Sequence, residues 1–158
     1  MENIEKKSEQ TKIGTRDLFL ETLTKIGCQY EIDSDDGRIL FSYQGENFVV
    51  SATNEGRIVW VWDTYWGSVD LYDVDEFSRL RKAINIANLN CPIMTVYTID
   101  EERKTVDVHC KSSFPFMSQM PDIEDYLRYE LGGFFNAHRS VYNEMDKLRE
   151  QDETVKTN

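Results

Sequence analysis

The order of the apolar patterns is the feature that most constrains how this chain can fold. A pattern of helical period covers residues 16–27, three short segments of alternating apolar residues follow, and a second helical pattern covers residues 74–89. Two more alternating segments and a long helical pattern complete the chain. Alternating segments joined by short turns form antiparallel hairpins. The sequence therefore predicts an α+β fold of the order α-β-β-β-α-β-β-α, with a five-stranded antiparallel sheet and three helices.

The strand segments are separated by residues that favour tight turns. Gly45 and Gly56 each follow polar residues between two alternating segments, and a charged turn at residues 100–104 separates the last two. The predicted strands are residues 39–43, 48–52, 57–63, 93–99 and 105–111.

The predicted helix ends carry capping residues. Thr15 is expected to be the N-cap of the first helix, and Asp73 with Glu76 forms a capping box for the second. The last helix is expected to begin near Pro121. A glycine pair at residues 132–133 interrupts it, at a cost of about 1 kcal/mol each relative to alanine. We expect this pair to allow close packing against another backbone, with a kink as the alternative.

The length and the net charge of the chain limit the number of domains and the kinds of partner that we expect. A chain of 158 residues is expected to form one domain, over residues 13–148, with a disordered segment at 1–12 and a polar tail at 149–158. The net charge of −11 argues against a nucleic-acid partner, because such a surface repels phosphates. No apolar run approaches the ~20 residues of a membrane helix, and the N-terminal segment lacks the apolar stretch of a signal peptide. We therefore expect a cytoplasmic protein with no membrane partner.

No catalytic or metal-binding motif is apparent. The three cysteines are widely spaced and form no CxxC pattern, so we expect them to be reduced and mostly buried. His109 and Cys110 are neighbours on a predicted strand and would point to opposite faces. His138 lies on the apolar side of the last helix and is expected to be a packed residue rather than a base. We predict no catalytic residue, no metal and no cofactor.

The segment from Trp60 to Trp66 is the most unusual stretch of the chain. Trp60 and Trp62 would lie on one face of a strand, and Val59 and Val61 on the other, so both faces of the sheet are apolar here and need cover. Either the last helix covers the second face within one chain, or a second protomer or a client does. Because tryptophan and tyrosine often anchor interfaces, the predicted partner-binding residues are Trp60, Trp62, Tyr65, Trp66, Phe134 and Phe135.

From residue 77 onward the chain resembles the YbjN-like family, described as bacterial sensory transduction regulators. The resemblance lies in the stretches 83–93, 96–100 and 106–110 and in the closing helix at 121–145, and its outline extends over residues 14–148. It implies a fold like that of type III secretion chaperones, a non-enzymatic role, and a dimer that holds an extended client segment. The tryptophan-rich strand and the glycine pair at 132–133 depart from the family pattern.

Two functions follow from these observations. The first is a protein-binding domain that acts as a chaperone-like or regulatory adaptor, with the homodimer that the resemblance implies. The alternative is a small-ligand sensor with an aromatic-lined pocket. A deep cavity beside Trp60 or Trp62 would favour a ligand, whereas a flat exposed patch would favour a polypeptide.

Overall fold

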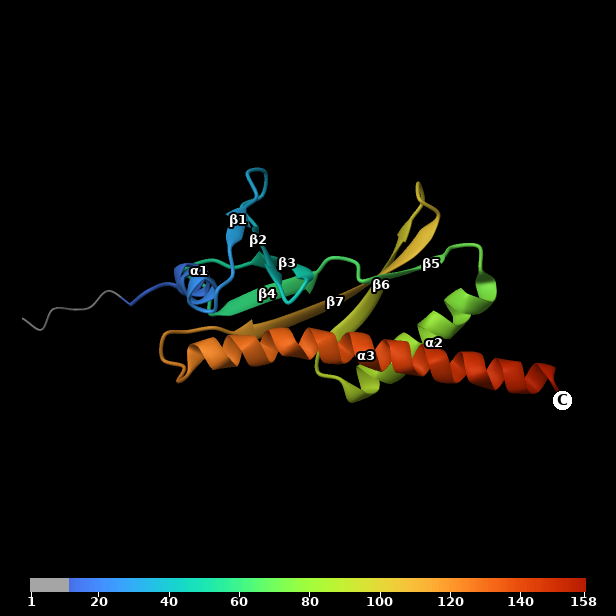
Figure 1. Cartoon of the computed structure of the whole chain (residues 1–158). Coiled ribbons are helices and arrows are strands. Elements are labelled where there is room, and N and C mark those ends of the chain that lie inside the picture. The colour runs from blue at the N-terminus through green and yellow to red at the C-terminus, as the bar shows by residue number, and fades with distance from the viewer. Residues whose placement is uncertain (1–11) are drawn as a thin grey trace, which may run out of the picture.

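A computed structural model describes residues 12–158 and contains, within that range, three helices and seven strands (Figure 1). The helices are α1 (Thr15–Lys25), α2 (Val74–Asn90) and α3 (Ile123–Lys156). The strands are β1 (Tyr30–Ile32), β2 (Ile39–Tyr43), β3 (Glu46–Ser51), β4 (Ile58–Asp63), β5 (Gly67–Asp70), β6 (Met94–Asp100) and β7 (Thr105–Pro115). The predicted α+β class is confirmed. The short strands β1 and β5 are additional to the predicted five.

One antiparallel sheet contains all seven strands, in the order β1-β2-β3-β4-β7-β5, with β6 also paired to β7. Strand β7 is central to this arrangement because it is long enough to pair with three other strands. Strand β4 pairs with residues 111–115 of β7, and β5 pairs with residues 105–108. Strand β6 pairs with residues 105–111. Because β6 overlaps both of the other registers, it must lie along the opposite edge of β7 from β4 and β5.

All three helices pack on one face of the sheet. Helix α1 and the first half of α3 cover β2, β3 and β4, whereas α2 and the second half of α3 cover the strands around residues 105–108 (Figure 1). The first region includes the buried residues Phe19, Leu23, Phe41, Phe48, Val59, Val61, Leu127 and Phe134. The second includes Leu80, Ala83, Ile84, Val106, Val108, Val141 and Met145. The opposite face therefore receives no helix from the described residues.

The predicted capping is half formed at α2, where the Asp73 amide donates to the Asp70 carbonyl oxygen at 3.2 Å rather than to Glu76, and it is not formed at α1. The Asp73 side chain accepts a hydrogen bond from the Glu76 amide at 3.0 Å, as expected. Helix α1 already includes Thr15, and its N-cap is Gly14. The Thr15 hydroxyl instead lies 2.8 Å from the carbonyl oxygens of both Gly56 and Phe116. It therefore ties the start of α1 to distant loops, which the local sequence does not reveal.

The glycine pair lies inside an unbroken helix, α3. A Cβ atom at Gly133 would lie 3.1 Å from Cγ1 of Ile93, so this glycine allows close packing. The contact is with a side chain rather than with the backbone that we expected. A Cβ atom at Gly132 would meet nothing within 4 Å.

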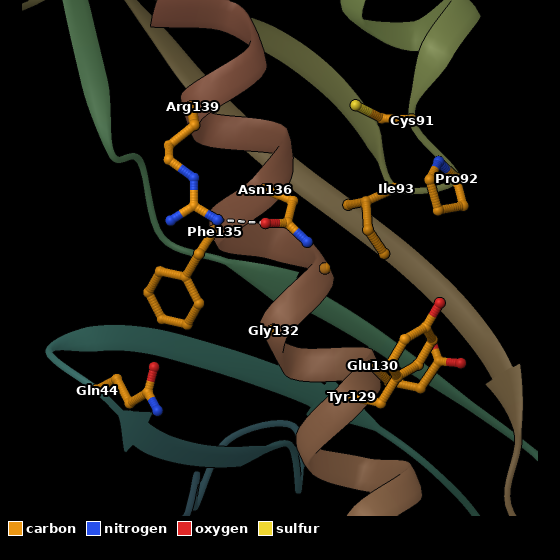
Figure 2. Close-up of a pocket in the computed structure, with 11 residues that line it drawn as sticks. Gln44, Cys91, Pro92, Ile93, Tyr129, Glu130, Gly132, Phe135, Asn136 and Arg139 are labelled. Carbon is orange, nitrogen blue, oxygen red and sulfur yellow. Dashed lines mark hydrogen bonds between the residues drawn. The ribbon is translucent and has the colours of Figure 1, made fainter.

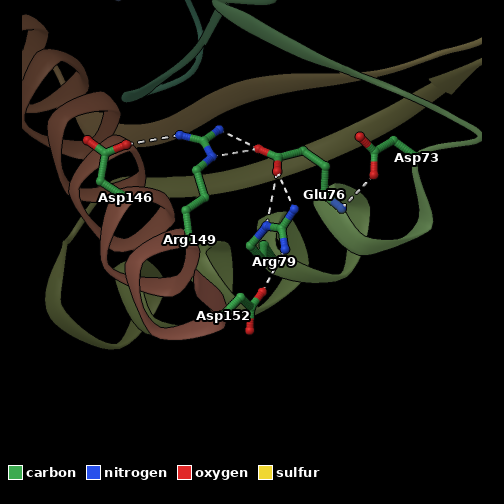
Figure 3. A network of polar contacts seen from close by, with 6 residues as sticks. All are labelled: Asp73, Glu76, Arg79, Asp146, Arg149 and Asp152. Atoms are coloured by element: carbon green, nitrogen blue, oxygen red, sulfur yellow. Dashed lines mark hydrogen bonds and ion pairs between the residues drawn. The ribbon is translucent and has the colours of Figure 1, made fainter. Parts of the chain in front are cut away.

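Helix α3 continues to Lys156, so most of the expected polar tail at 149–158 is helical. The reason is a network of ion pairs that connects α3 to α2 (Figure 3). The Glu76 carboxylate accepts hydrogen bonds from Arg149 Nε at 2.9 Å and from Arg79 Nη2 at 2.8 Å. Arg79 also donates to Asp152 at 2.6 Å. The expected disordered segment at 1–12 falls almost entirely outside the described residues.

Glu76→Gln should weaken this network. Hydrogen bonds from Arg149 and Arg79 hold the pKa of Glu76 below its usual 4.5. A carboxylate with a lowered pKa adds stability that is present above that value and is lost as the pH falls through the lower value of the folded state. We expect Glu76→Gln to lower the free energy of unfolding by about 1 kcal/mol at pH 7, and by much less at acid pH. Urea denaturation at both pH values checks this.

The matched control is Glu55→Gln in the exposed turn at residues 54–56. This substitution removes the same charge outside the network and should leave stability almost unchanged. Equal losses for the two variants, or a loss that does not depend on pH, would contradict the role given to Glu76.

Candidate functional site

The face of the sheet that lacks helices carries large apolar side chains on β4. Strand alternation buries Val59 and Val61 against the helices and directs Ile58, Trp60 and Trp62 to the opposite face. Ile58 is 46% exposed and Trp60 is 50% exposed, whereas Trp62 is half-buried. The predicted division of this strand into two apolar faces is confirmed.

The register of the sheet extends this apolar surface across five strands. Leu40 lies opposite Val49, and Val49 opposite Trp62. Trp62 in turn lies opposite Lys111, and Lys111 opposite Met94, which is 50% exposed. Neighbours in such a row lie close enough for their side chains to touch. Trp62 is therefore partly covered by its neighbours in the sheet.

Trp60 stands in a second row, between Ser51 on β3 and Ser113 on β7. These small side chains leave the indole of Trp60 prominent. We call the apolar residues of the two rows, together with Ile58, the open face; its members are Leu40, Val49, Ile58, Trp60, Trp62 and Met94. The charged residues of these two rows are Lys111 and, at the β1 end of the first row, Glu31 opposite Leu40, although the chain as a whole carries −11.

The structure divides the six predicted partner-binding residues among different places. Trp60 and Trp62 belong to the open face. Tyr65 is 49% exposed and has the Arg103 guanidinium 4.7 Å from the centre of its ring. Trp66 is half-buried and stacks on His138 of α3, with 4.4 Å between ring centres. Trp66 therefore lies on the helix-covered side of the sheet, away from the open face.

Phe134 was wrongly included among the partner-binding residues. Its side chain is fully buried and packs edge-to-face on Phe48, with 5.1 Å between ring centres. It lies on the same stripe of α3 as Leu127 and Leu131, which faces the sheet. Phe135 is half-buried, with its ring centre 6.3 Å from that of Tyr43.

The first of the two alternatives for the second face, cover by α3 within one chain, is also wrong. Helix α3 packs on the same face as α1 and α2, and Trp60 remains half-exposed. The physical reason is that α3 has one apolar stripe, which the buried face of the sheet already occupies. Within residues 12–158, therefore, no helix covers the open face.

One cavity of the described residues lies away from the open face, and another overlaps its margin at Leu40 and Val49. One of about 630 Å³ is lined by Ile93, Phe135, Arg139 and neighbouring residues between α3 and the start of β6 (Figure 2). A second of about 740 Å³ lies beside β1, β2 and β3 and includes Leu40 and Val49. Neither is lined by Trp60 or Trp62. The surface around these tryptophans is thus a patch on a sheet rather than a deep cavity.

A buried polar cluster lies on the helix-covered side, where β4 ends and β5 has not yet begun. Asp63 is fully buried there, and its Oδ1 accepts a hydrogen bond from the Cys110 amide at 2.6 Å. Asp63 Oδ2 lies 2.7 Å from His138 Nε2. The carboxylate therefore takes the place of a missing strand partner and connects β7 to α3. His138 is a packed residue, as expected.

This cluster is poorly suited to catalysis. Burial, with the charge of Asp63 as a second cause, raises the pKa of the Cys110 thiol to about 12, so the sulfur stays protonated at neutral pH. Burial also raises the pKa of Asp63, and the hydrogen bonds from His138 and Cys110 oppose this shift. One ligand atom from each of Asp63, Cys110 and His138 lies within 4.8 Å of the others, a set that could hold a metal. A metal would have to displace the Asp63–His138 hydrogen bond.

Only part of this cluster of Asp63, Cys110 and His138 could be recognised from the sequence. His138 stood out as a polar residue on an apolar helix stripe, but Asp63 is separated from it by 75 positions and resembles any polar residue at a strand end. Only a search for buried partners of His138 could have paired the two.

No protein-family model, curated protein or solved structure matches this chain. None of the helices within residues 12–158 combines the length and apolar character needed to cross a membrane. The function of the chain must therefore be inferred from the open face and the buried cluster themselves.

Asp63→Ala should destabilise the fold strongly. The substitution leaves the Cys110 amide and the His138 ring without their buried partner, and we expect a loss of about 3 kcal/mol in the free energy of unfolding. Asp63→Asn keeps a carbonyl oxygen for the amide and should lose less. Urea denaturation compares the variants. Wild-type stability in Asp63→Ala would contradict the bridging role of this carboxylate.

Thiol labelling tests the burial of the cysteines. Cys28 and Cys110 are buried and burial raises the pKa of both, whereas Cys91 is half-buried. With Ellman's reagent, we expect one thiol to react in the native protein and three after unfolding. Cys91→Ser should remove the native reaction, and a second fast thiol in that variant would contradict the packing described here.

Proposed function

We propose that this chain is a non-enzymatic polypeptide-binding domain, a chaperone-like or regulatory adaptor of the YbjN-like type. The single observation that carries the proposal is the open face, on which Ile58 and Trp60 remain about half-exposed while every helix packs on the other side. Contiguous apolar surface of this kind marks interaction sites in soluble proteins.

The composition of the open face suits a polypeptide partner. Trp60 and Trp62 offer large side chains of the type that most often anchors protein interfaces. The surrounding residues Ser51 and Ser113 are small, which leaves room for a partner beside the Trp60 indole. A face with few charges can be desolvated at lower cost than the acidic remainder of the surface.

A non-enzymatic role is supported by the state of the polar groups near the sheet. Cys110 has a protonated, buried thiol, and Asp63 uses both oxygens in hydrogen bonds. These groups serve the packing of β7 on α3 and are not presented to solvent.

The alternative, a small-ligand sensor, is supported by the cavity of about 630 Å³ beside α3 (Figure 2). Tyr129 and Phe135 supply aromatic rings, and Arg139 supplies a positive charge. This cavity lies apart from the tryptophans, so it is a less direct match to the aromatic-lined pocket expected from the sequence.

Site-specific photo-crosslinking tests the proposal. A benzophenone amino acid replaces Trp60 in one variant, and Tyr129 on α3, which is 78% exposed, in a control variant. In extracts of the source cells, we expect discrete adducts that contain a second polypeptide from position 60 and few from position 129. Adding Trp62→Lys to the position-60 variant should reduce the yield about tenfold, because a 1.4 kcal/mol loss corresponds to that factor.

Mass spectrometry of the adducts decides between the two functions. Equal yields from positions 60 and 129, or no polypeptide adduct from position 60, would contradict the proposal. Purified protein that retains a small molecule, and loses it in Arg139→Ala, would instead support the sensor.

A further inference from the structure

The buried cluster of Asp63, Cys110 and His138 brings together a carboxylate, a thiol and an imidazole, the three kinds of side chain that bind zinc in proteins. One ligand atom from each residue lies within 4.8 Å of the others, and all three residues are buried. Polar groups are costly to bury unless each has a partner. The partners within the cluster therefore show what the site still lacks.

The carboxylate of the cluster is satisfied, but the sulfur is not. The Cys110 thiol lies 3.3 Å from Thr95 Oγ1. The nearby Trp66 indole N–H is buried and has no hydrogen-bond partner among the described residues. Burial and the charge of Asp63 raise the pKa of this thiol to about 12, and the Thr95 and Trp66 side chains oppose that shift. A thiol is a weak acceptor, whereas a thiolate would accept hydrogen bonds from both side chains.

A cation would allow the sulfur to ionise inside the protein. With Asp63 and Cys110 both ionised, two negative charges would be buried. In the part of the chain that the structure describes, no lysine or arginine forms an ion pair with either residue. A Zn²⁺ ion balances these two charges, and the imidazole of His138 binds it as a neutral ligand. A thiol that binds a metal ion loses its proton outright, even where burial disfavours the free thiolate.

We propose that Asp63 Oδ2, Cys110 Sγ and His138 Nε2 bind one Zn²⁺ ion. The ion takes the place of the direct Asp63–His138 hydrogen bond, and the proton of the thiol is released to solvent. A site with three protein ligands completes its tetrahedron with a water molecule. The Cys110 amide keeps its hydrogen bond to Asp63 Oδ1, and outer hydrogen bonds of this kind hold metal-binding carboxylates in orientation.

The ligand atoms lie close to the spacing that zinc requires. Bonds of about 2.0–2.3 Å place the ligand atoms of a tetrahedral site about 3.5 Å apart. Asp63 Oδ2 and His138 Nε2 are 2.7 Å apart, so binding separates them by less than about 1 Å. The third ligand atom, within 4.8 Å of the others, has to approach them by at most about 1.3 Å.

The three ligands belong to segments far apart in the chain: the end of β4, strand β7 and helix α3. Asp63 and His138 are separated by 75 positions, which is why no metal-binding spacing appears in the sequence, from which we predicted no metal. Because all three ligands are buried, with Trp66 stacked on His138, we assign the ion a structural role. It fastens α3 to the sheet and stabilises the native protein as free zinc increases.

Cobalt titration of the metal-free protein tests the site. Co²⁺ is added to the native protein and also during refolding from urea, since the cluster is buried. We expect one equivalent to bind, with a thiolate-to-cobalt charge-transfer band and the intense visible bands of tetrahedral Co²⁺. Zn²⁺ should displace it, because tetrahedral sites with a thiolate favour zinc.

The matched variants are Cys110→Ser and Cys91→Ser. The first should remove the charge-transfer band and raise the Kd for Co²⁺ by at least about tenfold. The second removes a half-buried thiol outside the cluster and should change neither. No binding at micromolar Co²⁺ under either condition, or an unchanged band in Cys110→Ser, would overturn the proposal.

X-ray absorption at the zinc edge tests the ligands without altering the cluster. In zinc-loaded Cys91→Ser protein, we expect one sulfur neighbour at about 2.3 Å and nitrogen or oxygen neighbours at about 2.0 Å. Zinc held only by nitrogen and oxygen atoms would mean that the ion binds surface carboxylates or the exposed histidine, and would contradict the assignment to Cys110.

This inference goes beyond the proposed function and is independent of it. Trp60→Lys should abolish polypeptide binding at the open face and leave the cobalt spectrum unchanged. Cys110→Ser should abolish that spectrum and leave cross-linking from position 60 in place. The two experiments can therefore fail separately.

Discussion

The buried carboxylate of Asp63 is the interaction on which the rest of the architecture depends. Strand β7 continues past the point where β4 ends and β5 begins, and the amide of Cys110 would have no strand partner in that gap. Asp63 accepts a hydrogen bond from that amide with one oxygen and pairs with His138 of α3 through the other. A buried charge is costly unless it is fully paired. The same residue therefore completes the sheet and attaches the long helix to it.

Attachment of α3 at this point determines which face of the sheet stays open. His138 and the apolar stripe of α3 lie on the face that α1 and α2 also cover. The other face keeps Trp60 and its neighbours without helix cover, while Asn88 engages only one position on the outer edge of β6. The face and the edge offer two different surfaces, one for side-chain burial and one for backbone pairing.

Local rules predicted the parts of the fold that depend on neighbouring residues. The Asp73 cap and the alternation of β4 both depend on residues that lie within a few positions of each other in the chain. The strands β1 and β5 were missed because they are three and four residues long and take their structure from their partners. Phe134 and Phe135 look equivalent in sequence, yet the rotation of about 100° between consecutive residues of a helix separates a core residue from a half-buried one.

The amino-acid sequence by itself determined the α+β class, the position of most helices and strands, and the presence of two apolar faces on β4. These properties follow from the periodicity of apolar residues and from capping, which act over short distances. Only the tertiary structure decided that all helices share one face, that Asp63 meets His138, and that Asn88 binds the edge of β6. Each of these depends on which of several compatible surfaces come together, and that choice is made by packing between segments far apart in the chain.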